Sequence, residues 1–286
     1  MLHELRLFCI AVQFLTRVPV PRRVGFEPDW LNQSARHFPA VGACVGAVAA
    51  LVLWAASAVF PPAVAVGLSL AATLLLTGGF HEDGLADTCD ALGGAVSRER
   101  ALEIMKDSRI GSYGAAGLVL ALALKAALLV ALVEIDPLFA CIALAWSHAA
   151  SRAAPVWLSW KLPYAGDAAH AKAKPLATQI NGVTVCVALG WVLLLSLMLV
   201  AGAHYVSDAE EMLSTSTDEY STAAVFTRAM EYALVAAVAA ISLAGWIAAR
   251  WLTRRIGGFT GDTLGALQQV CEIVSLMVWL AVAHGG

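Results

Sequence analysis

Three aspartates, Asp83, Asp87 and Asp90, stand at i, i+4 and i+7 in the segment GGFHEDGLADTCDALGG, residues 78–94. On an α-helix these positions fall within about 60° of arc, so the three carboxylates face the same way. Like charges on one helix face repel one another unless a cation lies among them. We therefore predict a hard, oxygen-liganded site for a divalent cation, with these three aspartates as ligands and catalytic residues.

Two residues beside the aspartates are weaker candidates for the same site. Glu82 lies about 100° around the helix from the aspartate face, so we include it only as a secondary metal ligand. His81 lies further round, and a lone histidine is more often structural than a base, so we keep it as a candidate substrate contact. Mg²⁺ is held by one or two carboxylates together with substrate phosphates. The segment therefore predicts Mg²⁺-assisted phosphoryl transfer on a phosphate-bearing substrate.

Basic residues that could hold such phosphates follow in the segment EIMKDSRIGSYG, residues 103–114. A guanidinium grips a phosphate through two hydrogen bonds, and an ammonium acts as a point charge. Lys106 and Arg109 are therefore candidate substrate contacts, with Asp107 beside them. The alternative is that these charges mark the cytoplasmic side of a membrane and form ordinary helix ion pairs.

Two further segments carry one candidate substrate contact each. FLTRVPVPRR, residues 14–23, places Arg17 between two apolar stretches. Membrane topology and anionic headgroups account for most of that charge, and contact with an anionic substrate is the alternative. GGFTGDTLGA, residues 257–266, places Asp262 ahead of the last apolar run. Asp262 either caps that helix or completes the metal or nucleotide site.

The elements that must position these residues are membrane helices. Hydrophobic residues make up 60% of the chain and charged residues 14%, with a mean hydropathy of +0.75; these values exclude a soluble domain. Apolar runs long enough to span a bilayer recur at about 38–60, 62–80, 113–133, 138–156, 182–203, 230–250 and 264–283. We predict an all-α, polytopic helical bundle with about seven transmembrane helices, forming a single domain over residues 1–286.

The distribution of basic residues predicts the orientation of this bundle. If seven spans alternate, all of the 18 Lys and Arg residues except Lys125 and Arg228 fall on one side, including Lys172 and Lys174. Basic residues concentrate in cytoplasmic loops, so the N-terminus and every candidate site residue are predicted to face the cytoplasm. The opposite side carries an acidic, Ser/Thr-rich segment around 207–222, which we expect to be a loosely packed loop without chemistry.

Several other features call for a structural explanation. Residues 2–16 predict an amphipathic helix on the cytoplasmic surface. Ser97 predicts the N-cap of a short helix to Arg109, which Gly111 would stop. The six scattered cysteines are expected to be small apolar residues.

Lys125 and Glu272 both lie inside predicted spans, where charged residues are functional candidates by default. They either pair with each other, which would be structural, or serve a function. In the second case Glu272 would face a substrate cavity.

Taken together, the motifs resemble the cobalamin synthase family, whose members are adenosylcobinamide-GDP ribazoletransferases. The matching strings are FLTRVPVP at 14–21, TGGFHEDGLADTCDALGG at 77–94, EIMKDSRIG at 103–111 and TGDTLGA at 260–266. The resemblance implies a multi-pass enzyme of the bacterial inner membrane that uses Mg²⁺ in vitamin B12 biosynthesis. It implies adenosylcobinamide-GDP and α-ribazole, or its 5′-phosphate, as substrates, with cobalamin or its 5′-phosphate and GMP as products. We expect no nucleic-acid partner, and the sequence leaves open whether the enzyme forms a homo-oligomer.

The residues fit the chemistry that this resemblance implies. Mg²⁺ on the three aspartates would bridge the diphosphate, and either Asp87 or Asp90 would take the proton of the attacking hydroxyl. Lys106 and Arg109 would steady the phosphates. Asp262 would bind a second ion or a ribose hydroxyl.

Two other functions compete with this interpretation. A CDP-alcohol phosphotransferase also places spaced aspartates at a membrane face, but Asp87 stands where that family has an arginine in its D-G-x-x-A-R motif. A transporter would use Lys125 and Glu272 as coupling groups. No paired half-repeats support a transporter, and transport gives no reason for a cytoplasmic aspartate triad.

Overall fold

The structure is a computed structural model that describes residues 2–25, 27–166, 180–213 and 222–285. Within these ranges the chain is helical, and one isolated bridge joins Tyr164 to Phe259. The α-helices are α1 (Leu2–Leu15), α2 (Pro28–Ser34), α3 (Phe38–Ser57), α4 (Pro62–Thr77), α5 (Phe80–Leu92), α6 (Arg98–Ile104), α7 (Ser112–Ile135), α8 (Pro137–Ala150), α9 (Ala153–Lys161), α10 (Gly182–Leu213), α11 (Thr222–Ile256) and α12 (Gly261–Gly285). The predicted all-α fold and the helix at residues 2–16 are confirmed.

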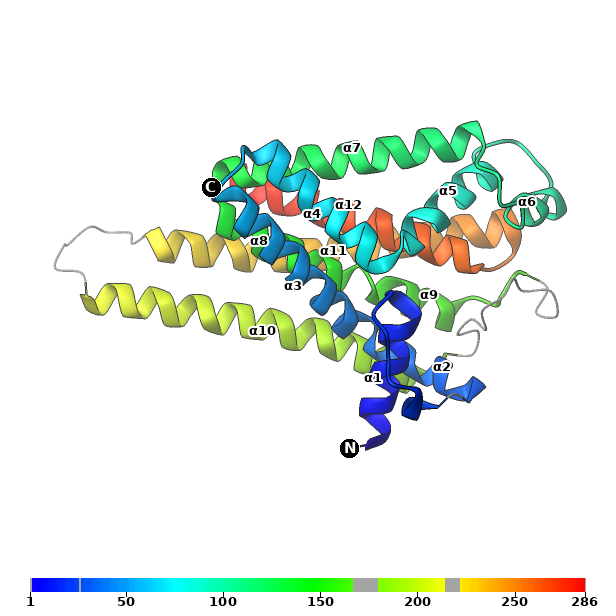
Figure 1. The fold of residues 1–286 in the computed structure, drawn as a ribbon, viewed down its shortest axis with the longest axis horizontal. Coiled ribbons are helices and arrows are strands. Elements are labelled where there is room, and N and C mark those ends of the chain that lie inside the picture. Colours follow the sequence, from blue (N-terminus) through cyan, green and yellow to red (C-terminus); the bar gives the residue numbers. More distant parts are fainter. Residues whose placement is uncertain (1, 26, 167–179, 214–221, 286) are drawn as a thin grey trace.

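The long helices run back and forth between two ends of the molecule (Figure 1). α3, α7, α10 and α12 lead away from the end that carries α5 and α6, and α4, α8 and α11 lead back towards it. Among the described residues, five helices are long and apolar enough to cross a membrane, or six if the bent pair α4–α5 forms one span. This is roughly consistent with the seven predicted spans and supports a multi-pass membrane protein.

The fourth predicted span, 138–156, is divided between two helices. α8 ends at Ala150, and α9 begins at Ala153 after a turn at Ser151 and Arg152. Pro155 explains the break, because it lacks the N–H that would bond to the carbonyl of Ser151 and its ring would clash there. The break places the Arg152 side chain inside the bundle, where only 2% of the residue is exposed.

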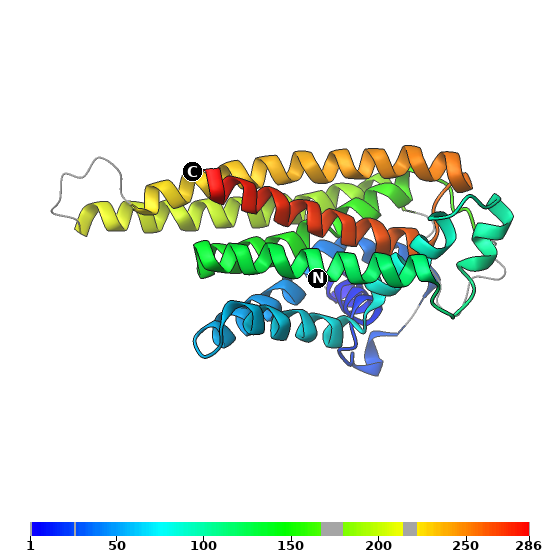
Figure 2. The ribbon, with the colours of Figure 1, turned by 90° about the horizontal axis from the view of Figure 1, so that it is seen from above.

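Three expectations about connecting segments were wrong. The acidic segment is helical through Leu213, because residues such as Ala209, Glu210 and Glu211 favour helix and continue α10. α10 and α11 project beyond their neighbours there (Figure 2).

The short helix capped by Ser97 ends at Ile104, not Arg109. Asp107 Oδ1 accepts a hydrogen bond from the Arg109 N–H, which forms a turn instead. Gly111 is the N-cap of α7 and not a helix stop. Lys172, Lys174 and residues 214–221 lie outside the described part of the chain.

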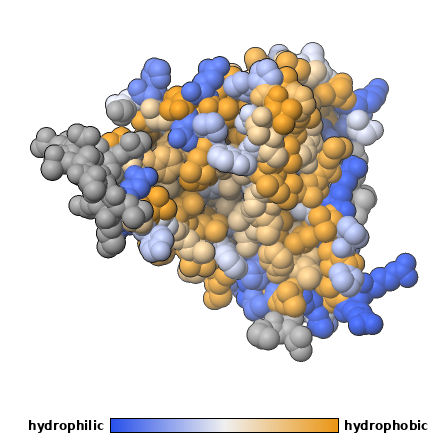
Figure 3. All heavy atoms as spheres, turned by 60° about the vertical axis from the view of Figure 1, so that its left-hand side comes forward, coloured by the Kyte–Doolittle hydropathy of each residue, from blue (hydrophilic) through white to orange (hydrophobic). Residues whose placement is uncertain are grey.

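Apolar side chains cover much of the face of the bundle that Figure 3 shows. Leu51, Leu75, Leu120 and Val235 are 67%, 76%, 69% and 73% exposed. Contiguous exposed apolar surface of this kind is a liability in water and the normal condition in lipid. The exposed leucines and valines of these helices therefore mark the lipid-facing surface.

α3 and α8 pack backbone against backbone through a G-x-x-x-G pair. A Cβ built on Gly46 would lie 2.7 Å from the Cα and the carbonyl oxygen of Ala145, and one on Gly42 would collide with the carbonyl oxygen of His148. Small residues permit such close approach between membrane helices, where van der Waals contact is a main source of association energy. The two glycines therefore set the distance between α3 and α8.

We predict that Gly46→Ala lowers the thermal unfolding midpoint of the purified protein, with a cost of about 1–3 kcal/mol, because the added methyl overpacks the α3–α8 contact. Gly67→Ala on α4 is the matched control, since its Cβ would meet nothing within 4 Å. The packing argument is wrong if the two variants unfold at the same temperature in the same detergent.

Candidate functional site

α5 carries the predicted aspartates, and a two-glycine turn sets its direction. α4 ends at Thr77 and α5 begins at Phe80. Gly78 and Gly79 lie between them, with φ angles of +71° and +68°. Both values lie in the left-handed region that glycine enters without steric cost. The chain consequently bends by 89° between α4 and α5. The bend turns α5 away from the path of α4 and packs it against α12 and α7.

α5 and α12 meet at their glycines. A Cβ on Gly84 would lie 2.8 Å from the carbonyl oxygen of Asp262, and a Cβ on Gly265 would lie 3.2 Å from the carbonyl oxygen of His81. The glycine of the E-D-G string therefore permits close helix packing. This packing brings the backbone of Asp262 against the aspartate helix, although 178 residues separate Gly84 from Asp262 in the sequence.

The cap of α12 is made by threonines. Thr260 Oγ1 accepts from the Thr263 N–H at 3.3 Å, and Thr263 Oγ1 accepts from the Thr260 N–H at 2.9 Å. Asp262 lies in the first turn, where a negative charge is favoured by the helix dipole. Asp262 was expected either to cap α12 or to complete the site. Thr260 provides the hydroxyl cap, and Asp262 is a partly exposed carboxylate at the α5–α12 contact.

The three aspartates share α5 but have different surroundings. Asp83 is exposed, and Asp87 and Asp90 are partly buried. The Asp90 carboxylate accepts hydrogen bonds from the backbone N–H groups of Gly111 at 2.7 Å and Gly114 at 2.8 Å. Asp90 therefore holds the start of α7 against α5, a role that helical spacing alone could not indicate.

The α5 carboxylates suit a Mg²⁺ ion whose coordination is completed by substrate phosphates and water. In the described residues, no three or more His, Cys, Asp and Glu side chains are grouped as a metal site. Asp83 presents its carboxylate to solvent, and each Asp90 oxygen keeps a second lone pair beside its bond to α7. Mg²⁺ needs only one or two carboxylates when water and phosphate supply the remaining ligands. Metal binding at these aspartates stays a prediction.

The N-terminal motif reaches the beginning of α5. The Arg17 side chain lies across Gly78, in the space that a Cβ would occupy, and the Arg17 N–H donates to the carbonyl of Leu76 at 2.8 Å. The Phe14 ring meets the Phe80 ring edge to face, with centroids 5.3 Å apart. Arg17 therefore lies at the α4–α5 turn, beside the aspartate helix, as a phosphate contact would require.

His81 is 5% exposed, and its side chain lines a small cavity with Phe14, Arg152 and Gly261. Its ring meets the Phe80 ring edge to face. This buried setting agrees with the structural interpretation of His81.

Lys106, Asp107 and Arg109 lie in the loop between α6 and α7, at the same end of the bundle as α5 (Figure 1). Lys106 and Arg109 are exposed. The Arg109 guanidinium lies 2.6 Å from Asp107 Oδ2, and this hydrogen-bonded carboxylate raises the pKa of Arg109. Arg109 therefore stays charged and is held beside the start of α7.

Two arginines that sequence patterning explains as topology signals have structural partners. Arg98 Nε donates to the carbonyl of Ile256 at 2.7 Å, at the end of α11. Arg255 donates to the carbonyl of Gly94 at 2.8 Å, just beyond α5. Both bonds satisfy carbonyls at or beyond helix C-termini. Together they tie the loops that surround α5.

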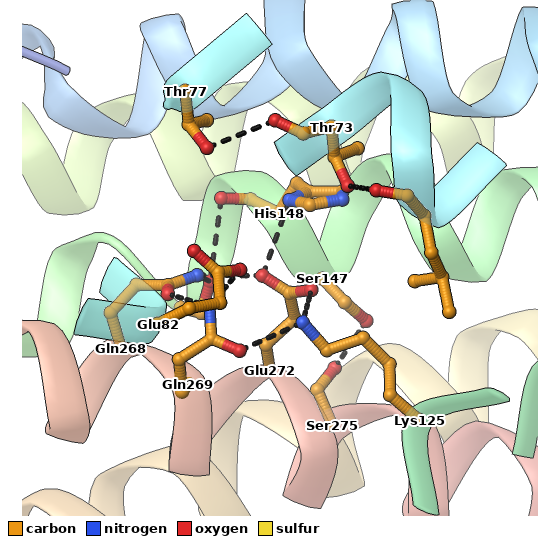
Figure 4. A network of polar contacts seen from close by, with 12 residues as sticks. Thr73, Thr77, Glu82, Lys125, Ser147, His148, Gln268, Gln269, Glu272 and Ser275 are labelled. Carbon is orange, nitrogen blue, oxygen red and sulfur yellow. Dashed lines mark hydrogen bonds and ion pairs between the residues drawn. The ribbon is translucent and has the colours of Figure 1, made fainter. Parts of the chain in front are cut away.

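Of the two alternatives for Lys125 and Glu272, the structure shows that they pair with each other. The Lys125 ammonium lies 2.9 Å from Glu272 Oε1, and the two side chains are 3% and 1% exposed. Lys125 also donates to Gln269 Oε1 at 2.8 Å, and His148 Nδ1 lies 3.2 Å from Glu272 Oε2. Lys125 on α7, Glu272 on α12 and His148 on α8 thus link the three helices (Figure 4).

The network continues from this pair to the aspartate helix. Gln268 donates to Glu272 Oε2 at 2.6 Å, and Gln269 donates to Gln268 Oε1 at 2.8 Å and to Glu82 Oε1 at 3.0 Å. Sequence reasoning missed Gln268, Gln269 and His148. The available signal was their polarity inside apolar runs, where such side chains usually bond across helices.

We predict that Lys125→Met destabilises the protein by about 3–5 kcal/mol, because it leaves the Glu272 carboxylate buried without its cation. The double variant Lys125→Met/Glu272→Leu should recover most of this loss, since it removes both charges. Thermal unfolding of the single and double variants in one detergent measures the difference. A double variant no more stable than Lys125→Met would contradict the pairing.

Comparison with known proteins gives a consistent result over nearly the whole chain. The sequence model of the cobalamin-5-phosphate synthase family matches residues 7–280. An adenosylcobinamide-GDP ribazoletransferase from Leptothrix cholodnii is 56% identical over 281 residues, covering 98% of this chain and 97% of the relative. Proteins of the same name from Polaromonas sp. and Shewanella amazonensis are 44% and 42% identical, covering 94% and 97% of this chain and 94% and 96% of the relatives. No solved structure matches.

Proposed function

The chain belongs to the cobalamin-5-phosphate synthase family, and from this premise we propose that it is an adenosylcobinamide-GDP ribazoletransferase. It is a membrane transferase that acts in cobalamin biosynthesis. Its substrates are adenosylcobinamide-GDP and α-ribazole or α-ribazole 5′-phosphate. The observation that carries the proposal is the family match from residue 7 to 280, which includes the aspartate helix and every segment packed around it.

The reaction is a phosphoryl transfer between two oxygen atoms. A ribose hydroxyl of the acceptor attacks the phosphorus that is bonded to the cobinamide arm. A new phosphodiester forms, the bond from that phosphorus to the bridging oxygen breaks, and GMP leaves with that oxygen. The hydroxyl proton passes to a carboxylate of the enzyme, so the balance needs no further reactant.

The carboxylates of α5 divide this work. Asp83 and Asp87 would hold Mg²⁺, with Asp90 at the edge of the site. When bound, the ion would neutralise negative charge on the diphosphate and on the departing GMP. The hydroxyl proton would pass to Asp87 or Asp90, and of these two the Asp90 carboxylate accepts two backbone hydrogen bonds from α7.

The basic residues would bind and orient the diphosphate. Lys106 and Arg109 would contact the phosphates from the α6–α7 loop, and Arg17 would do so from the α4–α5 turn. Asp262 would bind a ribose hydroxyl or a second ion beside Gly84. The concentration of basic residues at this end supports a cytoplasm-facing site in the bacterial inner membrane.

We predict that Asp87→Asn abolishes GMP release from adenosylcobinamide-GDP and α-ribazole 5′-phosphate, because the amide can neither take the proton nor bind Mg²⁺ as a carboxylate does. EDTA should have the same effect on the wild-type protein. Chromatography of GMP and of the cobalamin product measures both.

Asp208→Asn is the matched control, since Asp208 is exposed on α10 at the opposite end of the bundle. Full GMP release by folded Asp87→Asn would refute the site assignment. Folded wild-type protein that releases no GMP would refute the function itself.

We predict that Arg109→Ala raises the KM for adenosylcobinamide-GDP about 10-fold and changes kcat little, because a charge-assisted hydrogen bond contributes about 1.5–3 kcal/mol. Arg100→Ala removes an equally charged, exposed side chain whose partner is Glu103 on the same helix, and it should leave KM unchanged. Initial rates of GMP release over a range of substrate concentrations decide the matter. Equal KM values in the two variants would exclude Arg109 from phosphate binding.

A further inference from the structure

The orientation of α5 about its own axis decides where its carboxylates point. The turn before α5 consists of Gly78 and Gly79, which restrict rotation of the helix less than any other residues would. At the far end, Asp90 fixes the helix to α7 through two backbone N–H groups. Near the start of α5, Phe80 packs against Phe14 and Gly84 packs against the backbone of Asp262. A directional hydrogen bond there would add to these contacts in holding the helix at one rotation.

Glu82 makes such a hydrogen bond. Its Oε1 accepts a hydrogen bond from Gln269 Nε2 at 3.0 Å. Gln269 sits eight residues after Gly261, about 12 Å along α12. The Glu82 side chain therefore points to the interior of the bundle, beside the amides of Gln268 and Gln269 (Figure 4).

Both ends of the Gln269 amide, which binds Glu82, are hydrogen-bonded to other side chains. Gln269 Oε1 accepts from Lys125 at 2.8 Å, and Gln269 Nε2 donates to Gln268 as well as to Glu82. Gln269 is 2% exposed and Glu272 is fully buried. The Gln269 amide makes hydrogen bonds to Lys125, Gln268 and Glu82, which together fix its orientation. Glu82 is therefore bonded to a positioned group.

Glu82 and Asp83 are adjacent in the chain but differ in their surroundings. Successive residues on a helix point about 100° apart. Asp83 is exposed, whereas Glu82 Oε2 is buried without a hydrogen-bond partner and its Oε1 is bound to α12. The Glu82 carboxylate is thus directed away from the solvent that Asp83 faces.

We propose that Glu82 is a positioning residue and not a Mg²⁺ ligand: the bond from Gln269, backed by the Lys125–Glu272 pair, sets the rotation of α5 that presents Asp83 and Asp87 to the substrate. This inference rests on the proposed function. It makes Gln269, Lys125 and Glu272 contributors to the transfer reaction even though none of them touches the substrate.

The test compares variants that keep the hydrogen bond with variants that remove it. Glu82→Gln keeps a carbonyl acceptor for Gln269 and removes the charge. Gln269→Met and Glu82→Met remove the bond from either side at similar side-chain length. Ser275→Ala is the matched control, because Ser275 is a fully buried α12 residue whose hydroxyl lies 2.7 Å from Ser147 on α8.

Three quantities are measured on the full chain in lipid nanodiscs. These are kcat and KM for both substrates, the Mg²⁺ concentration that gives half-maximal GMP release, and the hydrogen exchange of α5 amides by mass spectrometry. We expect Gln269→Met and Glu82→Met to lower kcat and raise the half-saturating Mg²⁺ concentration, each about 10-fold, with KM for the riboside unchanged. Exchange should rise in α5 but not in α8. Glu82→Gln and Ser275→Ala should stay within about threefold of wild type.

Two results would overturn the proposal. Glu82→Gln as inactive as Asp87→Asn would make Glu82 a ligand or a base. Gln269→Met and Glu82→Met with wild-type α5 exchange and a wild-type Mg²⁺ requirement would make the bond irrelevant to the site. Should either Met variant fail to fold, the other tests the same bond. Exchange of α5 is measured without turnover, so it tests the positioning even if the wild type releases no GMP.

Discussion

The relative placement of α7, α8 and α12 depends on the ion pair between Lys125 and Glu272. Both charges lie where water is excluded, so each depends on the other and on the amides of Gln268 and Gln269. Breaking such a pair is far costlier than breaking one at a surface. The geometry that satisfies these groups also fixes α7, α8 and α12 relative to one another. Because the chain of hydrogen bonds ends on Glu82, it fixes the beginning of α5 as well.

Close backbone contact supplies the second constraint. α3 meets α8 at Gly42 and Gly46, and α5 meets α12 at Gly84 and Gly265. In a membrane, van der Waals contact of this kind carries much of the association energy between helices, because lipid offers no hydrophobic drive. The α3–α8 contact also holds the backbone of His148, which brings its ring to Glu272.

The acidic residues of α5 therefore serve different purposes within one short helix. Asp90 is bound to the first turn of α7, Glu82 is bound to α12, and Asp83 faces solvent. Asp90 and Glu82, which are bonded to other helices, orient the remaining carboxylates of α5 for catalysis. Residues hydrogen-bonded to metal ligands orient those ligands in many enzymes in the same way. A helix bent by 89° from the preceding span needs such attachments, since its own backbone bonds do not determine its direction.

The sequence by itself determined the features that depend on local pattern. Hydropathy predicted the apolar helices, charge placement predicted that the candidate residues share one end, and the spacing of Asp83, Asp87 and Asp90 predicted a helix. The motif strings predicted the family. Each of these follows from residue type and short-range periodicity, which the chain carries whatever its fold.

Only the tertiary structure decided which partner each polar group meets. Glu82 accepts its hydrogen bond from Gln269, 187 positions away, and Asp90 accepts one from Gly111, 21 positions away. No periodicity encodes such contacts, because they depend on how the helices bend and pack. The break at Pro155 and the turn at Gly78–Gly79 could be suspected from composition, but their angles could not. The division of the carboxylates between attachment and chemistry therefore became visible only when the helices were in place.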